Sequence, residues 1–306
     1  MNVLALDVGG TTIKGGLVNE KLKIKEKFIE DTPKKESSFL SLIEKIHDRF
    51  SNETEQVSLG MPGFVDNDNH IFKYGTNMQF SIDFKKLELI KDKKIYLEND
   101  GNLAAYSEYL LHFKNDYKNL IMLTFGTGIG GGIIHNSQIF KGSGNAGEIG
   151  RILINENSYL EDVISAKAWT KKCKELFEQN QNTELSKIFS EEKVGSLLFD
   201  KSIDLEDHEK LARDEIIVQT SLALVSLFEL FDNEIFVIGG SMTKNPYNFI
   251  PLIDKYIKKN FDFPNRSFPI IKLSKAREDS GLLGAALLAL NLSLYTHLTL
   301  PTNREV

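Results

Sequence analysis

The sequence predicts an α/β protein of two domains. Its 306 residues are long for a single hydrophobic core, so two domains are the natural expectation. Short apolar runs that end in glycine-rich turns alternate with segments whose apolar residues recur at helical spacing. The pattern of strand, glycine–threonine turn and strand stands near the start and returns after residue 119. We therefore expect the second half to echo the architecture of the first.

Composition narrows the classes of function. With 41% apolar and 26% charged residues, the chain has the composition of an ordinary soluble protein. A net charge of −6 without a basic stripe argues against nucleic acid as a partner. Cys173 is the only cysteine, which excludes an intramolecular disulfide and a thiolate zinc cluster. The apolar segment 216–231 is too short to cross a bilayer, and Met1 leads directly into the first strand, so we expect a cytoplasmic protein without a signal peptide or membrane contact.

The first hairpin, residues 4–18, has the chemistry of a phosphate-binding turn. Its glycines let backbone N–H groups approach an anion, and its threonines and lysine add donors and positive charge. The residues concerned are Gly9, Gly10, Thr11, Thr12 and Lys14. Asp7 stands where a Mg²⁺–phosphate complex needs a carboxylate. Taken alone, the segment is equally compatible with a plain surface hairpin.

The rest of the first half continues as strands and helices. We expect a strand and loop at 23–35, a helix at 39–50, a strand at 57–59, a strand at 94–98 and a helix at 103–112. The strand at 57–59 ends in a Gly-Met-Pro-Gly turn, and the strand at 94–98 is followed by Asn99-Asp100-Gly101-Asn102. Ligands bind at such strand ends in open α/β sheets. The polar residues 114–119 are the candidate hinge between the two predicted domains.

The second half restarts with a strand at 120–124, and the glycine run 126–132 is expected to turn it into a second strand at 133–134. Residues 165–232 should be mostly helical, with a weak interval at 179–210 and a buried helix at 211–231. A strand at 234–238 ends in Gly239-Gly240, and another lies near 272–273. The small-residue helix that opens at residue 280 should pack closely against a neighbour.

A dinucleotide fold is the first alternative, because Gly126, Gly128 and Gly131 satisfy G-x-G-x-x-G after a strand. That motif should open a helix, whose N-terminus carries the pyrophosphate. Residues 133–137 instead have the pattern of a strand and a turn, which argues against nicotinamide or flavin binding. No Walker-type motif occurs, and the six histidines show no paired ligand spacing.

Eight stretches, in order, resemble the ROK family of sugar kinases and repressors, which has the actin/hexokinase-like ATPase fold. They are LALDVGGTTIKGGLV, LGMPGFVD, LENDGNLAA, LTFGTGIGGGII, GNAGEIG, LEDVISA, VIGGS and EDSGLLGAALLAL. The resemblance implies two actin-like, ribonuclease H-like α/β domains that flank an ATP and sugar cleft. We place the N-terminal domain at 1–117 plus about 280–292 and the C-terminal domain at 118–279. Residues 293–306 follow no family pattern, so we expect a non-native or disordered tail.

The resemblance also implies where ATP binds. Residues 9–12 and Thr127-Gly128 would hold the phosphates from opposite sides, and Asp7 would help to hold Mg²⁺ through water. Gly239 and Gly240 would lie against the adenosine, where a side chain would obstruct it.

Asp100 is the candidate catalytic base. Phosphorylation of a sugar hydroxyl requires a carboxylate that accepts the proton as the alcohol attacks the γ-phosphate. A helix N-terminus next to Asp100 would keep it ionised, and a weak base suffices because the proton leaves late. The alternative, from the residues alone, is that Asn99-Asp100-Gly101 is a turn and helix cap.

The sugar hydroxyls would be bound by Asn77, Asn99, Glu148 and Glu161, which resemble the family's sugar ligands. Carboxylates and amides suit this task because each can take paired hydrogen bonds from neighbouring hydroxyls. The alternative for Glu161 is a solvated charge on a helix.

The chain departs from the family at its zinc site. Zinc-containing members have a histidine directly after GEIG and then a cysteine-rich segment, whereas this chain has Arg151 and runs from Ile152 to Tyr159 without a cysteine. We therefore expect no metal-ligating residues and no zinc, and residues 152–159 should be ordered by packing alone. Arg151 could pair with Glu148 or Glu161, or point at a sugar hydroxyl. The change leaves the identity of the sugar open.

These features predict an ATP-dependent kinase for the primary hydroxyl of a hexose or hexose derivative, with Mg²⁺ as cofactor and a homodimer as assembly. One rival is a sugar-sensing repressor of the same fold, which would carry an N-terminal DNA-binding domain ahead of the first hairpin. A second rival is a kinase-fold remnant that binds sugar without turnover. The retained Asp100 and both phosphate turns argue against the remnant.

Overall fold

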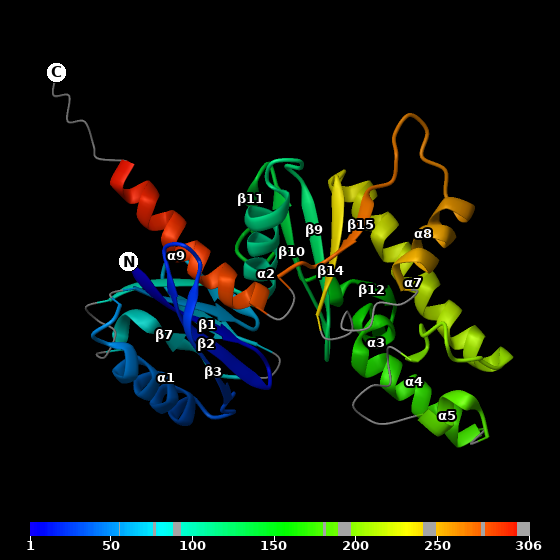
Figure 1. Cartoon of the computed structure of the whole chain (residues 1–306), viewed down its shortest axis with the longest axis horizontal. Coiled ribbons are helices and arrows are strands. Elements are labelled where there is room, and N and C mark those ends of the chain that lie inside the picture. Colours follow the sequence, from blue (N-terminus) through cyan, green and yellow to red (C-terminus); the bar gives the residue numbers. More distant parts are fainter. Residues whose placement is uncertain are drawn as a thin grey trace. The chain divides into compact units, whose positions relative to one another are not determined.

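The computed structural model describes residues 1–54, 56–75, 78–87, 93–179, 182–188, 197–240, 249–276 and 279–298. The chain divides into two compact units (Figure 1), which are described in turn. The first unit contains Met1–Leu111, Lys141–Ala146 and Asp279–Val306. The second contains His112–Phe140 and Gly147–Glu278. The predicted α/β class is confirmed, since each unit is a five-stranded sheet with helices.

The first unit is built on a sheet with the strand order β3-β2-β1-β4-β8. Its strands are β1 (Asn2–Val8), β2 (Thr12–Asn19), β3 (Ile24–Asp31), β4 (Gln56–Met61) and β8 (Lys94–Asn99). The first three form the antiparallel hairpins that the sequence predicts, whereas β4 and β8 run parallel to β1. The carboxyl ends of β1, β4 and β8 therefore lie along one edge of the sheet.

Both faces of this sheet are covered, which explains why β1 is apolar from Val3 to Leu6. Val3 and Ala5 pack against the helices α2 (Asp100–Glu108) and α9 (Ser280–Leu298). Leu4, Leu6 and Val8 point to the other face, where α1 (Glu36–Phe50) lies. Figure 1 shows α1 and α9 on opposite sides of the sheet. Successive side chains of a strand alternate between faces, so the part of β1 that is buried on both sides carries apolar side chains in succession.

A small antiparallel sheet, β5 (Phe64–Asp66), β6 (Ile71–Tyr74) and β7 (Ile82–Asp83), completes this half of the core and leads into the 3₁₀ turn η1 (Phe84–Lys86). Phe72 and Phe84 from this region are fully buried in the same cluster as α1. The small sheet and α1 therefore share one core, which contains Leu4, Leu6 and Val8 of β1.

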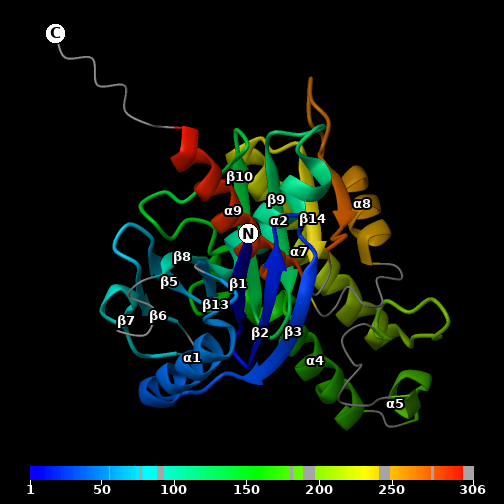
Figure 2. The same cartoon turned by 60° about the vertical axis from the view of Figure 1, so that its left-hand side comes forward.

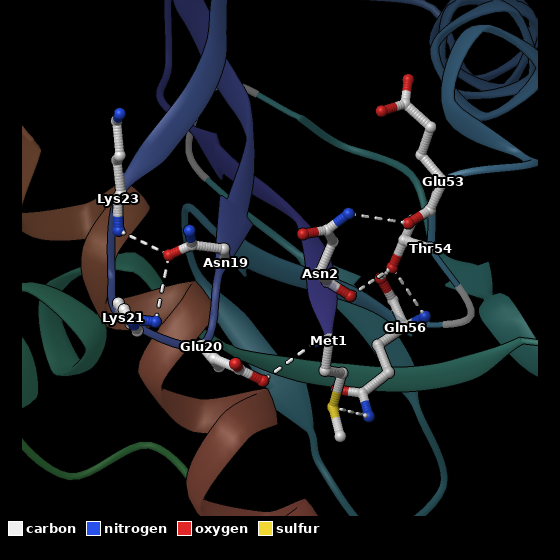
Figure 3. Close-up of polar contacts among 9 residues, drawn as sticks. All are labelled: Met1, Asn2, Asn19, Glu20, Lys21, Lys23, Glu53, Thr54 and Gln56. Carbon is white, nitrogen blue, oxygen red and sulfur yellow. Dashed lines mark hydrogen bonds and ion pairs between the residues drawn. The ribbon is translucent and has the colours of Figure 1, made fainter.

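Polar contacts fix the end of the first hairpin that is remote from the glycine turn (Figure 3). The N-terminal ammonium of Met1 lies 3.0 Å from the Glu20 carboxylate, and the Asn19 side chain accepts two backbone N–H groups of the β2–β3 turn, each at 3.0 Å. The Thr54 hydroxyl donates to the carbonyl of Asn2 at 2.7 Å. These contacts hold the end of the hairpin that lies opposite the glycine turn.

The second unit repeats this topology with the strand order β11-β10-β9-β14-β15. Its strands are β9 (Leu120–Phe125), β10 (Ile129–His135), β11 (Gln138–Ile139), β14 (Ile235–Gly239) and β15 (Ile270–Leu273). Again the first three are antiparallel and the last two run parallel to the first. Figure 2 shows β10, β9 and β14 side by side. The predicted echo of architecture is confirmed.

Helices cover this second sheet. They are α3 (Glu161–Ile164), α4 (Ala166–Gln179), α5 (Glu184–Ile188), α7 (Asp207–Phe231) and α8 (Phe249–Asn260). Helix α7 begins four residues before the predicted start, because Glu206 and Glu209 form a capping box there. The predicted burial of this helix holds for one face only, since Leu211, Leu222 and Leu230 are exposed. None of the described helices is long and apolar enough to cross a membrane.

Two local expectations of the second half are wrong. Residues 129–132 belong to strand β10 and not to the turn, because glycine here permits close packing: a Cβ at Gly131 would lie 2.8 Å from the Met122 carbonyl oxygen. Since a strand follows the glycines, the dinucleotide alternative is excluded. Residues 152–159 are ordered by more than packing, because β12 (Leu153–Asn155) and β13 (Ser158–Tyr159) pair as a hairpin.

Candidate active site

The first glycine turn joins β1 to β2, and hydrogen bonds to its carbonyl groups hold its shape. The N–H of Gly9 donates to the Thr12 carbonyl at 2.9 Å, which closes the turn. The Thr32 hydroxyl donates to the Gly9 carbonyl at 2.8 Å, and the Lys34 ammonium donates to the Gly10 carbonyl. Within the described part of the chain, the N–H groups of Gly10 and Thr11 have no acceptor. Donors without a protein acceptor, on a turn whose carbonyls are already bonded, suit an anionic ligand.

Asp7 stands at the end of β1, paired across the hairpin with Lys14. Burial raises the pKa of its carboxyl to about 6; Lys14 opposes the rise and Asp279 adds to it. The carboxylate lies against the first turn of α9, where a Cβ on Gly281 would come within 2.4–2.6 Å of its atoms. This contact explains the small-residue start of α9, whose predicted close packing is confirmed. A buried carboxylate with a raised pKa fits a cation, which would restore its charged form.

Asn99 and Asp100 lie at the junction of β8 and α2, and they divide two tasks between them. Asn99 caps the helix: its side-chain oxygen accepts the N–H of Asn102 at 3.1 Å, and its amide donates to the Gly63 carbonyl at 3.1 Å. Helix α2 therefore begins at Asp100, whereas the sequence predicts a start at residue 103. Because Asn99 supplies the cap, Asp100 is not needed for it, and its partly exposed carboxylate keeps the position of a helix first turn.

The sheet register brings these groups of the first unit to one edge. Asp7 lies opposite Gly60 on β4, and Gly60 lies opposite Glu98 on β8. Neighbouring strands are about 4.8 Å apart, so Asp7 and the end of β8 are separated by about 10 Å. A Cβ on Gly60 would lie 3.5 Å from the Cα of Asp100. The first glycine turn, Asp7, Asn99 and Asp100 thus share the carboxyl edge of one sheet, where open α/β sheets bind ligands.

The second glycine turn joins β9 to β10 in the second unit. The N–H of Gly126 donates to the Gly128 carbonyl at 3.0 Å, and the Gly126 carbonyl accepts the N–H of Ala166 at 2.9 Å. Thr127, at the tip, is exposed. The Glu161 carboxylate lies over this turn: it accepts the N–H of Ile129 at 3.3 Å, and a Cβ on Gly128 would lie 2.5 Å from its Oε2. Glu161 is therefore in contact with the turn, which the sequence did not predict.

Glu148, Arg151 and Glu161 form one electrostatic group in the second unit. Burial of its carboxyl raises the pKa of Glu148, although the residue as a whole is exposed; Arg151 opposes this rise and Glu161 adds to it. The Arg151 guanidinium stacks on the Tyr159 ring, 4.7 Å from its centre, with a 3.4 Å hydrogen bond to the hydroxyl. No ion pair from Arg151 to Glu148 or Glu161 occurs among the described residues. The pairing partner of Arg151 is thus an aromatic ring.

Gly239 and Gly240 end β14 and are required by packing within the protein. Gly240 has a φ of +93°, and a Cβ there would lie 2.4 Å from the Phe125 carbonyl oxygen. A Cβ on Gly239 would meet the Met122 side chain at 2.6 Å. Close packing therefore explains both glycines without a ligand, and contact with adenosine remains a prediction.

Two further expectations concern Asn77 as a sugar ligand and the absence of metal-ligating residues. Asn77 lies outside the described residues. Across the residues that the structure does describe, no group of three or more His, Cys, Asp or Glu side chains could hold a metal ion.

Comparison with known proteins places the chain in a family. The sequence model of the ROK family matches residues 3–291. This chain belongs to the ROK family. Among curated ROK relatives, the chain is 28% identical to a glucokinase of Thermotoga maritima, over 94% of this chain and 96% of that protein. It is also 28% identical to an N-acetylmannosamine kinase of Haemophilus influenzae, over 94% of each chain.

Solved ROK structures share the fold. A ROK family glucokinase from Streptomyces griseus, in complex with glucose and AMPPNP, superposes with a TM-score of 0.79 at 24% identity, covering 95% of this chain and all of that one. A ROK family transcriptional regulator, a homolog of the E. coli MLC protein, superposes with a TM-score of 0.77 at 20% identity, covering 97% of this chain and 80% of that one. At these identities the superpositions establish the actin-like fold, which kinases and regulators of the ROK family share.

Proposed function

We propose that this ROK protein is an ATP-dependent sugar kinase that transfers the γ-phosphoryl group of ATP to the primary hydroxyl of a hexose or hexose derivative. The observation that carries the proposal is the repeated hairpin turn: each unit presents a glycine–threonine turn at the same place in the same sheet topology. The curated relatives, a glucokinase and an N-acetylmannosamine kinase, support the reaction class.

The phosphates of ATP are assigned to these two turns, residues 9–12 with Lys14 and residues Thr127-Gly128. The support is the pair of N–H groups at Gly10 and Thr11 without acceptors among the described residues. Asp7 is assigned to Mg²⁺, which would neutralise phosphate charge when bound, and adenosine to Gly239 and Gly240.

Asp100 is assigned the role of general base. Its position at the first turn of α2, where the helix dipole favours a carboxylate, supports an ionised base at neutral pH. Accepting the proton of the attacking hydroxyl as the γ-phosphoryl group transfers is the only proton chemistry that the reaction requires.

The sugar is assigned to Asn77, Asn99, Glu148, Arg151 and Glu161. Glu148 and Glu161 interact electrostatically, as two acceptors of one hydroxyl-rich ligand would, and hydrogen bonds from hydroxyls favour their charged forms. Arg151, stacked on Tyr159, stands where a zinc-containing member has histidine. We assign it to substrate discrimination.

The wider assignments extend the same proposal. The unit of β1–β8 corresponds to the first phosphate and sugar domain, and that of β9–β15 to the second phosphate and adenosine domain. We propose that the protein acts as a homodimer in the cytoplasm and works without zinc. Stoichiometric zinc by elemental analysis of the purified protein would contradict the last point.

The second candidate function is a sugar-binding regulator without efficient turnover, because a ROK regulator shares the fold. The experiment that separates the two is a coupled ADP-release assay with Mg²⁺ and ATP over glucose, mannose, fructose, N-acetylglucosamine, N-acetylmannosamine and a β-glucoside. We expect ADP release that depends on at least one sugar. Binding of a sugar by calorimetry without any sugar-dependent ADP release would favour the regulator.

A further inference from the structure

Glu98 is a fully buried carboxylate immediately before the proposed sugar and catalytic residues. Its side chain is 0% exposed, at the second-last position of β8. Oε1 accepts the backbone N–H of Asn99 at 2.9 Å and the side-chain amide of Asn102 at 3.0 Å. Oε2 accepts the side-chain amide of Asn67 at 2.8 Å and lies 2.6 Å from the ammonium of Lys141.

These four donors leave Glu98 fully satisfied. A carboxylate can accept about four hydrogen bonds, and burying one without a cation costs several kcal/mol. Lys141 supplies the positive charge; its side chain is 36% exposed, so the ammonium reaches inward from the surface. The pair therefore belongs to the class of buried ion pairs whose loss leaves an uncompensated charge.

Lys141 belongs to a segment with an unusual place in the chain. Residues 141–146 are part of the first unit, whereas the residues on either side belong to the second. The segment is a tight turn: the N–H groups of Gly144 and Ala146 both donate to the Lys141 carbonyl, at 2.8 and 3.0 Å. Gly142 and Gly144 have φ values of +55° and +122°, which only glycine adopts readily. Its shape is thus fixed by glycines, and Lys141 is the charged anchor.

Two proposed sugar residues depend on this anchor. Asn99 has its N–H bonded to Glu98 itself, and Glu148 follows the segment by two residues. Because two residues span at most about 7 Å, Glu148 cannot move farther than that from the anchored segment. One buried carboxylate therefore constrains the strand end that carries Asn99 and Asp100 and the segment that leads to Glu148.

We propose that Glu98 and Lys141 are positioning residues for the sugar site. Their ion pair holds the segment 141–146 on the end of β8 and so fixes the acceptors that the sugar hydroxyls meet. The proposal rests on the proposed function for its kinetic consequence, but the tether itself can be tested without any activity.

The decisive variant is Lys141→Met, which keeps the apolar stem and removes the charge. We expect kcat/KM for the sugar to fall about 10- to 100-fold, as for a misplaced binding group. The Kd of a fluorescent ATP analogue, measured without sugar, should stay within about twofold of wild type, because the four donors to Glu98 described above come from residues outside the proposed nucleotide site. Lys141→Arg, which can still reach a carboxylate, should recover most of the loss.

A matched control is Lys258→Met. Lys258 also lies 2.6 Å from a carboxylate, that of Asp254, but both side chains are exposed, at 72% and 45%. An exposed pair contributes little, so this variant should keep wild-type kinetics. If Lys141→Met proves indistinguishable from Lys258→Met, or lowers only the melting temperature, the positioning role is wrong. Should Lys141→Met fail to fold, Lys141→Gln, which keeps a donor without the charge, carries the same test.

Hydrogen–deuterium exchange separates a failure of the tether from a failure of the proposed function. In Lys141→Met, and not in Lys258→Met, peptides covering residues 97–103 and 140–147 should exchange faster than in wild type. If wild type shows no sugar-dependent ADP release, the kinase proposal fails, yet faster exchange still supports the tether. Unchanged exchange in both peptides overturns the tether even in an active enzyme.

Discussion

The two glycine turns have the same backbone design but opposite chemistry around it. Each is closed by a glycine N–H that donates to a carbonyl of the same turn, from Gly9 to Thr12 and from Gly126 to Gly128. Two lysines lie at the first turn: Lys14 is paired with Asp7 across the hairpin, and the Lys34 ammonium donates to the Gly10 carbonyl. The second carries a carboxylate, Glu161, on the turn itself.

This difference indicates how a repeated fold acquires two roles. Phosphate charge needs cations, and the two lysines at the first turn support its proposed role in binding the nucleotide phosphates. A carboxylate on the second turn would repel phosphate unless it is bonded to other donors, such as sugar hydroxyls. Under the proposed function, Glu161 would therefore respond to both ligands, whereas Asp7 would serve the nucleotide alone.

The largest effect is expected at Asp100, the proposed general base. Asp100→Asn should lower kcat by about 10²–10⁴-fold, because the amide cannot accept the hydroxyl proton, while binding of an ATP analogue stays nearly intact. The measurement is sugar-dependent ADP release. Asp207→Asn, an exposed aspartate at the first position of helix α7, is the control and should match wild type. A kcat of about a tenth of wild type or more in Asp100→Asn would show that Asp100 is not the base.

The second-largest effect is expected in the pH dependence of stability, through the buried carboxyl group of Asp7. Because the pKa of Asp7 is about 6 in the fold and 3.8 in the unfolded chain, the fold favours its protonated form. Its contribution to stability is then fully present below pH 4 and is lost as pH rises through 6, by at most about 3 kcal/mol. Thermal unfolding of the nucleotide-free protein between pH 4 and 7 should show this loss in wild type.

Asp7→Asn is the matched variant for that measurement. It should lack this part of the pH dependence and be more stable than wild type near pH 7, since the amide carries no charge to bury. If the difference in melting temperature between the two proteins is the same at pH 4 and pH 7, Asp7 does not titrate in this range and its proposed burial cost is wrong.

A smaller effect compares two glycines that each touch a carboxylate. Gly281→Ala would place a Cβ 2.4 Å from the Asp7 carboxylate, and Gly128→Ala would place one 2.5 Å from that of Glu161. Asp7 is short and buried, whereas Glu161 has a longer, flexible chain that can move aside. We expect Gly281→Ala to cost about 1–3 kcal/mol of stability and to raise KM for ATP.

In Gly128→Ala the displaced Glu161 should raise KM for the sugar, with a change in stability below about 1 kcal/mol. Melting temperatures and the two KM values of both variants provide the measurement. The reverse pattern, in which Gly128→Ala is the less stable protein and Gly281→Ala affects only the sugar, would break the contrast between the two turns.

The smallest effect is expected at the C-terminus. Truncation after Asn291 keeps the hydrogen bond from its amide to the Tyr106 hydroxyl, 3.0 Å, and removes residues that the sequence predicts to be a non-native or disordered tail. The structure corrects this prediction for residues 293–298, which belong to helix α9. Melting temperature and kinetics should stay unchanged, although helix α9 runs on to Leu298. A fall in melting temperature of more than about 4 °C would show that the segment packs on the first unit.

Local sequence patterns predict the helices and strands of this fold. They do not predict which residues far apart in the sequence come into contact. Both hairpins and their glycine turns were predictable because strand, glycine and strand follow one another in the sequence. The contacts of Gly281 with Asp7 and of Lys141 with Glu98 join elements whose pairing no local pattern encodes.

The glycine-rich strand shows the converse error. Residues 129–132 looked like a turn because glycine favours turns, yet strand β10 needs small residues where the Ile149 side chain and the Met122 carbonyl lie within 2.8 Å of a Cβ built on Gly131. A single sequence cannot distinguish a glycine required by backbone conformation from one required by close packing. The assignment of Gly239 and Gly240 to adenosine has the same ambiguity, since Phe125 and Met122 already exclude a side chain there.

The most direct test of the proposed function identifies the product itself. Wild-type protein is incubated with Mg²⁺, ATP and the sugar that gives the most ADP release, and the reaction is followed by ³¹P NMR. We expect the γ-phosphate signal to be replaced, one for one with ADP, by a phosphomonoester on the primary carbon of the sugar. The 6-deoxy form of that sugar should give no product. Bound sugar with unchanged ATP, or inorganic phosphate in place of a sugar phosphate, would contradict phosphoryl transfer to the primary hydroxyl.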